Sequence, residues 1–449
     1  MRPAAPSFRE ALRFWLKLGF ISFGGPAGQI AIMHRERVER RRWISERRFL
    51  HALNYCMVLP GPEAQQLATY IGWLLHGTRG GMVAGALFVL PSLFILVALS
   101  WLYMRYGDVP FVNAVLHGIK PAVVAIVLAA AWRIGSRSLR HPLLWAIAAA
   151  AFVALFAFAI PFPIVILGAA LMGVAGGRIA PHAFASAGHA AAKGQQAPSV
   201  IDDDSPTPPH ARYDRARLAT TFLVFLTLWG LALAALAATF GWQADLTQMG
   251  WFFTRAALVT FGGAYAVLPY VLQGAVQDHG WITATQMIDG LALGETTPGP
   301  LIMVVAFVGF VGGWTKQLFG SEALFVAGAM GASVATLFTF LPSFLFILAG
   351  GPLVERTRDD LHLTAPLTAI TAAVVGVIVN LTVFFAWHVF WPGATAAAPL
   401  AVRVDWASVA IAVAASLALV ARRLDVIPVI GLSALAGLAL WAAGFQGAT

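Results

Sequence analysis

Phe23-Gly24-Gly25-Pro26 and Pro60-Gly61-Pro62 recur further along the chain as Phe261-Gly262-Gly263-Ala264 and Pro298-Gly299-Pro300. One ungapped shift of 238 positions aligns both pairs, and it also places Lys17 on Arg255 and Trp43-Ile44 on Trp281-Ile282. Beyond these motifs the shift becomes 251, which aligns Leu90-Pro91-Ser92 with Leu341-Pro342-Ser343. The second half therefore carries about 13 extra residues (251 minus 238), which we expect between Gly312 and Met330. The sequence predicts two homologous halves.

The composition is that of a membrane protein. Apolar residues make up 59% and charged residues 11% of the 449 positions, whereas about 25% of a typical soluble domain is charged. Apolar runs of about 18 residues or more, each long enough for one membrane-spanning helix, recur along most of the chain. Because a chain in lipid must satisfy its own backbone hydrogen bonds, we predict an all-α polytopic membrane protein surrounded by lipid.

The distribution of charge predicts the topology. The net charge is +9, but the basic residues lie mostly in short loops, as the positive-inside rule expects, and not on one face that would bind nucleic acid. Residues 34–48 carry seven arginines, whereas their repeat mates, residues 272–286, carry none. The first loop is therefore predicted in the cytoplasm and the second in the periplasm, which makes the two repeats inverted.

The basic loop formed by Arg133, Arg137 and Arg140 falls on the cytoplasmic side only if two earlier segments are re-entrant. These are the segments around Gly24-Gly25 and around Pro60-Gly61-Pro62. We then expect a multi-pass protein of the bacterial inner membrane with a cytoplasmic N-terminus and a periplasmic C-terminus.

Four regions follow from the repeat. Residues 1–180 form the first transporter repeat, and residues 241–449 form the second. Residues 181–217 are largely small and polar, so they are expected to be a disordered cytoplasmic linker. Residues 218–240 are one apolar helix without a counterpart in the first half, and this extra crossing inverts the second repeat.

The Pro-Gly-Pro motifs interrupt apolar stretches that would otherwise be continuous helix, because proline lacks an amide donor and clashes with the preceding turn. Matching breaks in two halves point to a transporter's binding site, where helix N-termini face an anion. A kink that only shapes packing is the alternative, and the duplication favours the site. Gly24, Gly25, Gly262 and Gly263 support the same site less strongly, because glycines also allow close helix packing.

Four ionisable residues near these motifs are candidates for function. Lys17 and Arg255 are matched cations inside apolar surroundings, where a charge is costly, although long basic side chains also extend to the membrane interface. Glu63 and Glu295 flank the two Pro-Gly-Pro motifs and are candidates for proton coupling. A capping role at a broken helix is an equal alternative for Glu63.

Several functions are disfavoured. The single cysteine, Cys56, excludes an intrachain disulfide and a Cys-rich metal site. The eleven histidines have no metal-ligand spacing, and the chain has no phosphate-binding loop. The sequence therefore predicts no metal, no cofactor and no ATP-driven pump. An enzyme would be a different functional class: an intramembrane enzyme with Glu295 and a histidine as acid and base. No catalytic groups pair or repeat in the sequence, so we expect no enzyme.

The motifs together resemble those of the chromate ion transporter family in its long, two-domain form. The first-half resemblance rests on residues 18–26, on Glu39-Arg40-Arg41-Arg42-Trp43, and on Leu59-Pro60-Gly61-Pro62 with Gln65-Gln66. Thr297-Pro298-Gly299-Pro300-Leu301 resembles the second-half motif. Ala264 departs from its mate Pro26, so the two halves need not contribute equally to a site.

The resemblance implies a secondary transporter that exports chromate, a tetrahedral dianion, and thereby gives chromate resistance. A carrier of sulfate or another oxyanion is the alternative within transport. The sequence leaves a homodimer open.

Overall fold

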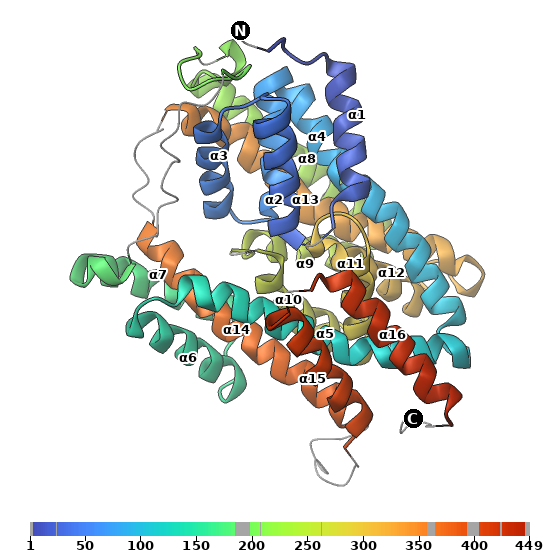
Figure 1. Ribbon diagram of the computed structural model, residues 1–449. Coiled ribbons are helices and arrows are strands. Elements are labelled where there is room, and N and C mark those ends of the chain that lie inside the picture. Colours follow the sequence, from blue (N-terminus) through green and yellow to red (C-terminus); the bar gives the residue numbers. More distant parts are fainter. Residues whose placement is uncertain are drawn as a thin grey trace.

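The computed structural model describes residues 3–23, 25–184, 198–206, 208–261, 263–356, 364–392, 404–422 and 424–444. These residues form sixteen α-helices joined by short 3-10 and π segments (Figure 1). The all-helical class expected from the composition is confirmed. Among the described residues, six helices are long and apolar enough to cross a membrane, and four shorter helices are also apolar.

The first half begins with two pairs of helical segments. They are α1 (Phe8–Ile21) with α2 (Gly25–His34), and α3 (Glu46–Val58) with the start of α4 (Glu63–Tyr106), separated by the π segment η1 (Arg35–Arg40). The long helix α5 (Pro110–Ser138) is followed by α6 (Pro142–Phe156), α7 (Phe162–Ile179) and the 3-10 turn η2 (Pro181–Phe184).

After the 3-10 turn η3 (Pro209–Ala211), α8 (Arg215–Phe240) occupies the position predicted for the extra helix. The second half then contains α9 (Asp245–Leu258), α10 (Ala264–Leu272), η4 (Gln273–Asp278), α11 (Ala284–Thr296), η5 (Leu301–Met303) and α12 (Val304–Thr315). It ends with η6 (Ser321–Ala323), α13 (Leu324–Arg356), α14 (Thr364–Phe390), α15 (Trp406–Val420) and α16 (Val426–Ala442).

The elements of the two halves match in order and in detail. The π segments η1 and η4 occupy repeat-equivalent positions, and α3 and α11 are equal in length. Ser45 and Thr283, which are repeat mates, each cap the following helix by accepting a backbone N–H three residues on, as expected of an N-cap hydroxyl. The connection between α12 and α13 includes η6, so it is longer than the corresponding turn in α4. The repeat expected from the motifs thus extends to local structure.

Helix α4 is a hairpin and not one straight rod. His76 and Gly77 leave the helical conformation, and Gly77 has a φ of +65°, which glycine adopts readily. A Cβ atom built on Gly72 would lie 2.6 Å from the Cβ of Ala84, so the arms on either side of the turn pack closely. Residues 63–75 therefore run back against residues 78–106.

Both helical pairs of the first half begin and end on one side of the molecule. The end of η1 returns to the start of α1, where Arg41 pairs with Glu10. Arg48, near the start of α3, and Tyr70, within residues 63–75, both contact Glu355. This arrangement agrees with the re-entrant segments expected from the loop charges.

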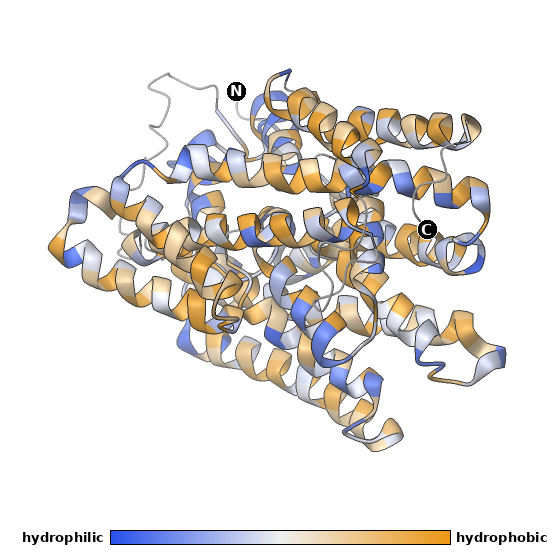
Figure 2. Ribbon diagram, turned by 90° about the horizontal axis from the view of Figure 1, so that it is seen from below, coloured by the Kyte–Doolittle hydropathy of each residue, from blue (hydrophilic) through white to orange (hydrophobic). Residues whose placement is uncertain are grey.

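The later helices are exchanged between the halves. Helices α6 and α7 of the first half pack on α14 of the second, whereas α15 and α16 of the second half pack on α5 of the first (Figure 1). Apolar residues also predominate along the outer helices (Figure 2), and large side chains such as Phe94 and Leu171 are more than half exposed. A chain that presents such a surface belongs in lipid. The inverted orientation of the halves remains a prediction, which this reciprocal packing supports.

Candidate functional site

The two Pro-Gly-Pro breaks are joined to the opposite half by matching hydrogen bonds. The backbone N–H of Gly61 donates to the carbonyl of Thr260 at 2.8 Å, and the N–H of Gly299 donates to the carbonyl of Ser22 at 2.8 Å. Gly61 pairs with Gly299, and Ser22 with Thr260, under the 238-residue shift. Each Pro-Gly-Pro break therefore lies against the end of the first helix of the other half.

Polar side chains surround the same two glycines. Gly61 and Gly299 have φ values of +119° and +116°, a region in which a residue with a Cβ atom is strained. Gln29 donates its amide to the carbonyl of Gly299 at 2.5 Å, and Ser92 donates its hydroxyl to the carbonyl of Pro298. These bonds satisfy backbone groups that a broken helix leaves unpaired, so the breaks are built features of the fold.

A central cavity of about 1520 Å³ reaches the region of both breaks. Gly25 and Gly263, which begin α2 and α10, both line it, as do Glu63 and Glu295. Its basic lining residues are Arg35, Arg133, Arg137, Arg140, His34, His141 and His182, and its further acidic ones are Glu39 and Glu46. Of the described residues of the four motifs, Gly25, Pro26, Gly263 and Ala264 line the cavity, whereas the residues of the two Pro-Gly-Pro breaks do not.

Two of the four glutamates that line the cavity, Glu63 and Glu295, lie close to the start of α10. Tyr265 donates its hydroxyl to Glu295, which is 7% exposed. A Cβ atom built on Gly263 would lie 3.7 Å from Oε1 of Glu63, so this first-half carboxylate points to the start of α10. Glu63 also directly follows Pro62, the N-cap residue of α4. The cavity thus brings together the two coupling candidates that the sequence could only place separately.

The remaining predicted residues lie elsewhere or outside the described residues. Lys17 is exposed on α1 and lines a smaller cavity, of about 350 Å³, together with Arg9 and Arg13. Arg255 is exposed on α9, with its guanidinium carbon 5.7 Å from the ring centroid of Trp251. Gly24 and Gly262 lie outside the described residues. A role for Lys17 and Arg255 in binding an anion stays a prediction.

Sequence reasoning missed two residues of the cavity. In the sequence Arg133 is a signal of topology only, yet it lines the cavity that also contains Glu295. Tyr265 has Ala27 as its repeat mate, so the repeat gives no signal there. Asymmetry between mates within a matched motif is the signal that would have drawn attention to Tyr265.

The arginine-rich loop does not consist only of surface charges. Arg37 is fully buried, and its guanidinium carbon lies 3.1 Å from the ring centroid of Phe14 and 3.7 Å from that of Trp43. Burial lowers the pKa of Arg37 to about 9, with the nearby Arg41 adding to the effect. The side chain therefore remains a cation at neutral pH, held between two aromatic faces.

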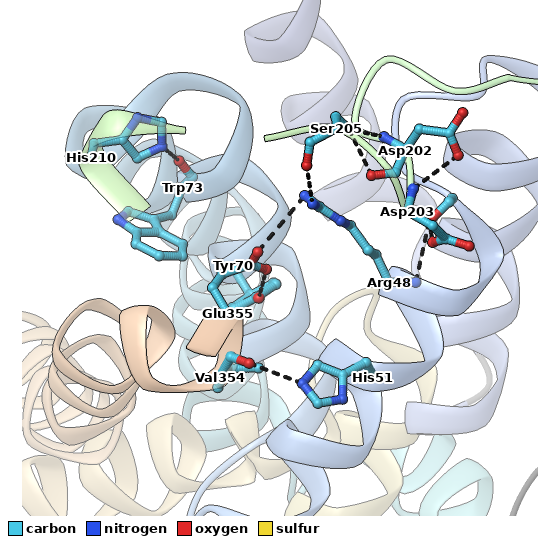
Figure 3. A network of polar contacts seen from close by, with 11 residues as sticks. Arg48, His51, Tyr70, Trp73, Asp202, Asp203, Ser205, His210, Val354 and Glu355 are labelled. Atoms are coloured by element: carbon cyan, nitrogen blue, oxygen red, sulfur yellow. Dashed lines mark hydrogen bonds and ion pairs between the residues drawn. The ribbon is translucent and has the colours of Figure 1, made fainter. Parts of the chain in front are cut away.

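The expectation of disorder across residues 181–217 is wrong for η2, residues 198–206, η3 and the start of α8. Residues 198–206 lie against the arginine-rich loop. Ile201 forms a parallel bridge with Ile44, and Ser45 donates its hydroxyl to Asp203 at 2.5 Å. Figure 3 shows Arg48 between this segment and α13, donating to the carbonyl of Ser205 at 2.8 Å and lying 3.7 Å from Glu355. Two apolar residues, Val200 and Ile201, and paired polar groups make this short docking favourable.

The chain is similar to known proteins across both of its halves. The family model described as chromate transporter matches residues 9–174 and 247–438. The chain is 33% identical to a chromate transport protein of Pseudomonas aeruginosa, over 85% of this chain and 82% of that protein. It is 29% identical to a chromate transport protein of Cupriavidus metallidurans, over 85% of this chain and 84% of that protein. No solved structure matches the chain.

Proposed function

Because this chain belongs to the chromate transporter family, we propose that it exports chromate as a secondary transporter and thereby confers chromate resistance. The substrate is a tetrahedral dianion. An inside-negative membrane potential contributes roughly 2.3 kcal/mol per charge per 100 mV, so the potential favours outward movement of such an ion. Export therefore needs no nucleotide.

The observation that carries the proposal is the wall of arginines in the central cavity. Arg133, Arg137 and Arg140 follow one another at intervals of three or four residues near the end of α5, and all three line the cavity. Charges of one sign in a cleft raise the local concentration of the opposite ion. This wall would draw a dianion from the cytoplasmic side toward the starts of α2 and α10.

At its inner end the cavity offers groups suited to an anion. The first N–H groups of α2 and α10 have no partner within their helices and lie at the positive end of the helix dipole. Glu63 and Glu295 lie beside them, and an ionised carboxylate repels a dianion. A bound dianion therefore favours protonated glutamates, so anion binding would be linked to proton binding.

Transport is tested with cells and with vesicles. Cells that produce the protein should accumulate less labelled chromate than cells without it and should grow at higher chromate concentrations. Inside-out vesicles should take up chromate when their lumen is made positive, as export by the intact cell requires. Equal accumulation in both cell lines, with the protein present in the membrane, would contradict the proposal.

Competition identifies the anion. Excess sulfate should reduce chromate uptake by the vesicles only slightly if the carrier discriminates between the two dianions. Complete suppression of chromate uptake, together with saturable uptake of labelled sulfate, would instead assign the chain as a general oxyanion carrier.

A further inference from the structure

Two repeat-equivalent pairs of helices are arranged differently in the structure. Helices α3 and α14 both line the central cavity, through residues such as Leu53 and Thr371. Their repeat mates, α11 and α5, pack directly against each other. Leu53 is partly exposed, whereas its mate Leu291 is fully buried. The space between α3 and α14 is therefore open to the cavity, whereas the equivalent space between α11 and α5 is closed.

The closed contact contains a buried ion pair between the two helices. Lys120 of α5 lies 3.7 Å from Asp289 of α11, and Tyr103 of α4 donates its hydroxyl to Asp289 at 2.9 Å. Asp289 is 2% exposed, and its Oδ1 atom has no hydrogen-bond partner among the described residues. Charges buried inside a membrane protein are costly and are retained mainly where they serve its function.

Repeat equivalence relates this ion pair to the open cavity. Under the 251-residue shift, Leu116, His117 and Lys120 correspond to Leu367, Thr368 and Thr371, and all three of these mates line the cavity. His117 is also held by an acid of the second half, with Nε2 lying 3.3 Å from Asp405. Transporters built from repeats alternate by exchanging the conformations of their halves. The mates of cavity-lining residues are then the residues that line the path on the other face.

We propose that a second, outward-facing path lies closed between α5 and α11, and that Lys120 binds the transported oxyanion in it once Asp289 releases the ammonium group. The inference rests on the proposed transport function. In the present conformation the carboxylate of Asp289 occupies the place of the anion. Opening of α11 away from α5 exposes Lys120, and a dianion replaces the carboxylate as its partner through charge-assisted hydrogen bonds.

Thiol labelling tests the path without using chromate. Leu116→Cys is treated with a negatively charged, membrane-impermeant methanethiosulfonate in right-side-out vesicles, with and without Asp289→Asn. The native Cys56 is buried, so the unsubstituted protein serves as background. We expect slow labelling of Leu116→Cys alone and faster labelling with Asp289→Asn. The mate Leu367→Cys should react from the cytoplasmic face, in inside-out vesicles.

Ala122→Cys on the same helix distinguishes opening of a path from general loosening. Ala122 is fully buried and belongs to an apolar cluster with residues of α15 and α16, in which no described residue of α11 takes part. If Asp289→Asn speeds the labelling of Leu116→Cys but not that of Ala122→Cys, the result supports the path. If it speeds the labelling of both equally, or of neither, the result overturns the path.

Transport tests the role of Lys120 itself. Lys120→Gln should lower net chromate efflux by about tenfold, whereas Lys120→Arg, which keeps the charge, should retain most of it. Wild-type efflux by Lys120→Gln would overturn the role of this cation. Failure of the unsubstituted protein to move chromate would refute the proposed function instead, and the labelling result would still decide whether the outer path exists.

Discussion

The backbone N–H of Gly61 donates a hydrogen bond to the carbonyl of Thr260, 2.8 Å away and 199 positions along the chain (260 minus 61). A single bond of this kind contributes only about 1 kcal/mol to stability. Its importance is positional, because it ties the break of one half to the end of α9 in the other. Any movement of the halves must preserve this bond or replace it.

Gly61→Ala and Gly299→Ala should each destabilise the protein and abolish transport. Both glycines have positive φ values, which cost a residue with a side chain about 1–3 kcal/mol. A Cβ atom on Gly61 would also lie 2.5 Å from the hydroxyl oxygen of Ser343. Thermal unfolding in detergent and vesicle uptake measure the two effects. Gly230→Ala, where a Cβ atom meets nothing within 4 Å, is the control, and equal behaviour of all three variants would contradict the argument.

Glu295→Gln should uncouple transport from protons while leaving anion exchange intact. The amide keeps the size of the side chain and its acceptor for the Tyr265 hydroxyl, but it cannot bind or release a proton. We expect net chromate uptake driven by a proton gradient to fall by about tenfold or more. Exchange of internal for external chromate should change little. Glu39→Gln, at an exposed cavity residue paired with His34, should leave both activities unchanged, and the same result for Glu295→Gln would exclude a coupling role.

Arg37→Ala should reduce stability, although the sequence places this residue among the seven arginines of one loop. The side chain fills the space between Phe14 and Trp43, and removing a buried side chain of this size costs about 2–5 kcal/mol. Arg37→Met, which keeps most of the volume and removes the buried charge, should be close to neutral. Thermal unfolding compares the two with Arg40→Ala, an exposed neighbour in η1. A melting temperature for Arg37→Ala as high as that of Arg40→Ala would show that the packing contributes nothing.

Patterns within the chain predicted much of the fold, because the repeat constrains it twice. The breaks at Pro60-Gly61-Pro62 and Pro298-Gly299-Pro300 follow from proline and glycine chemistry, which acts locally. The burial of Arg37 did not follow, because it depends on Phe14, which only the tertiary fold brings near. The docking of Ile201 on Ile44 depends likewise on a contact between distant segments. For the site, the repeat located both glycine motifs. It gave no weight to residues such as Tyr265, whose repeat mate is of a different type.

Substitution of Arg133 should reduce chromate transport more than substitution of either Lys17 or Arg255. Lys17 and Arg255 are the matched cations of the repeat, but neither lines the central cavity, whereas Arg133 does. A cation in a confined cleft attracts an anion more strongly than one at the surface, where water and salt screen the charge.

We therefore expect Arg133→Gln to raise the chromate concentration needed for half-maximal vesicle uptake by about tenfold, which corresponds to about 1.4 kcal/mol. Lys17→Gln and Arg255→Gln should change it by less than about twofold. Added salt should weaken uptake by the unsubstituted protein more than uptake by Arg133→Gln, because the variant has lost part of the electrostatic attraction. Protein abundance in the membrane is measured alongside to separate binding from folding. If Lys17→Gln and Arg255→Gln impair uptake while Arg133→Gln does not, the two matched cations bind the anion, and the arginine wall only supports the fold.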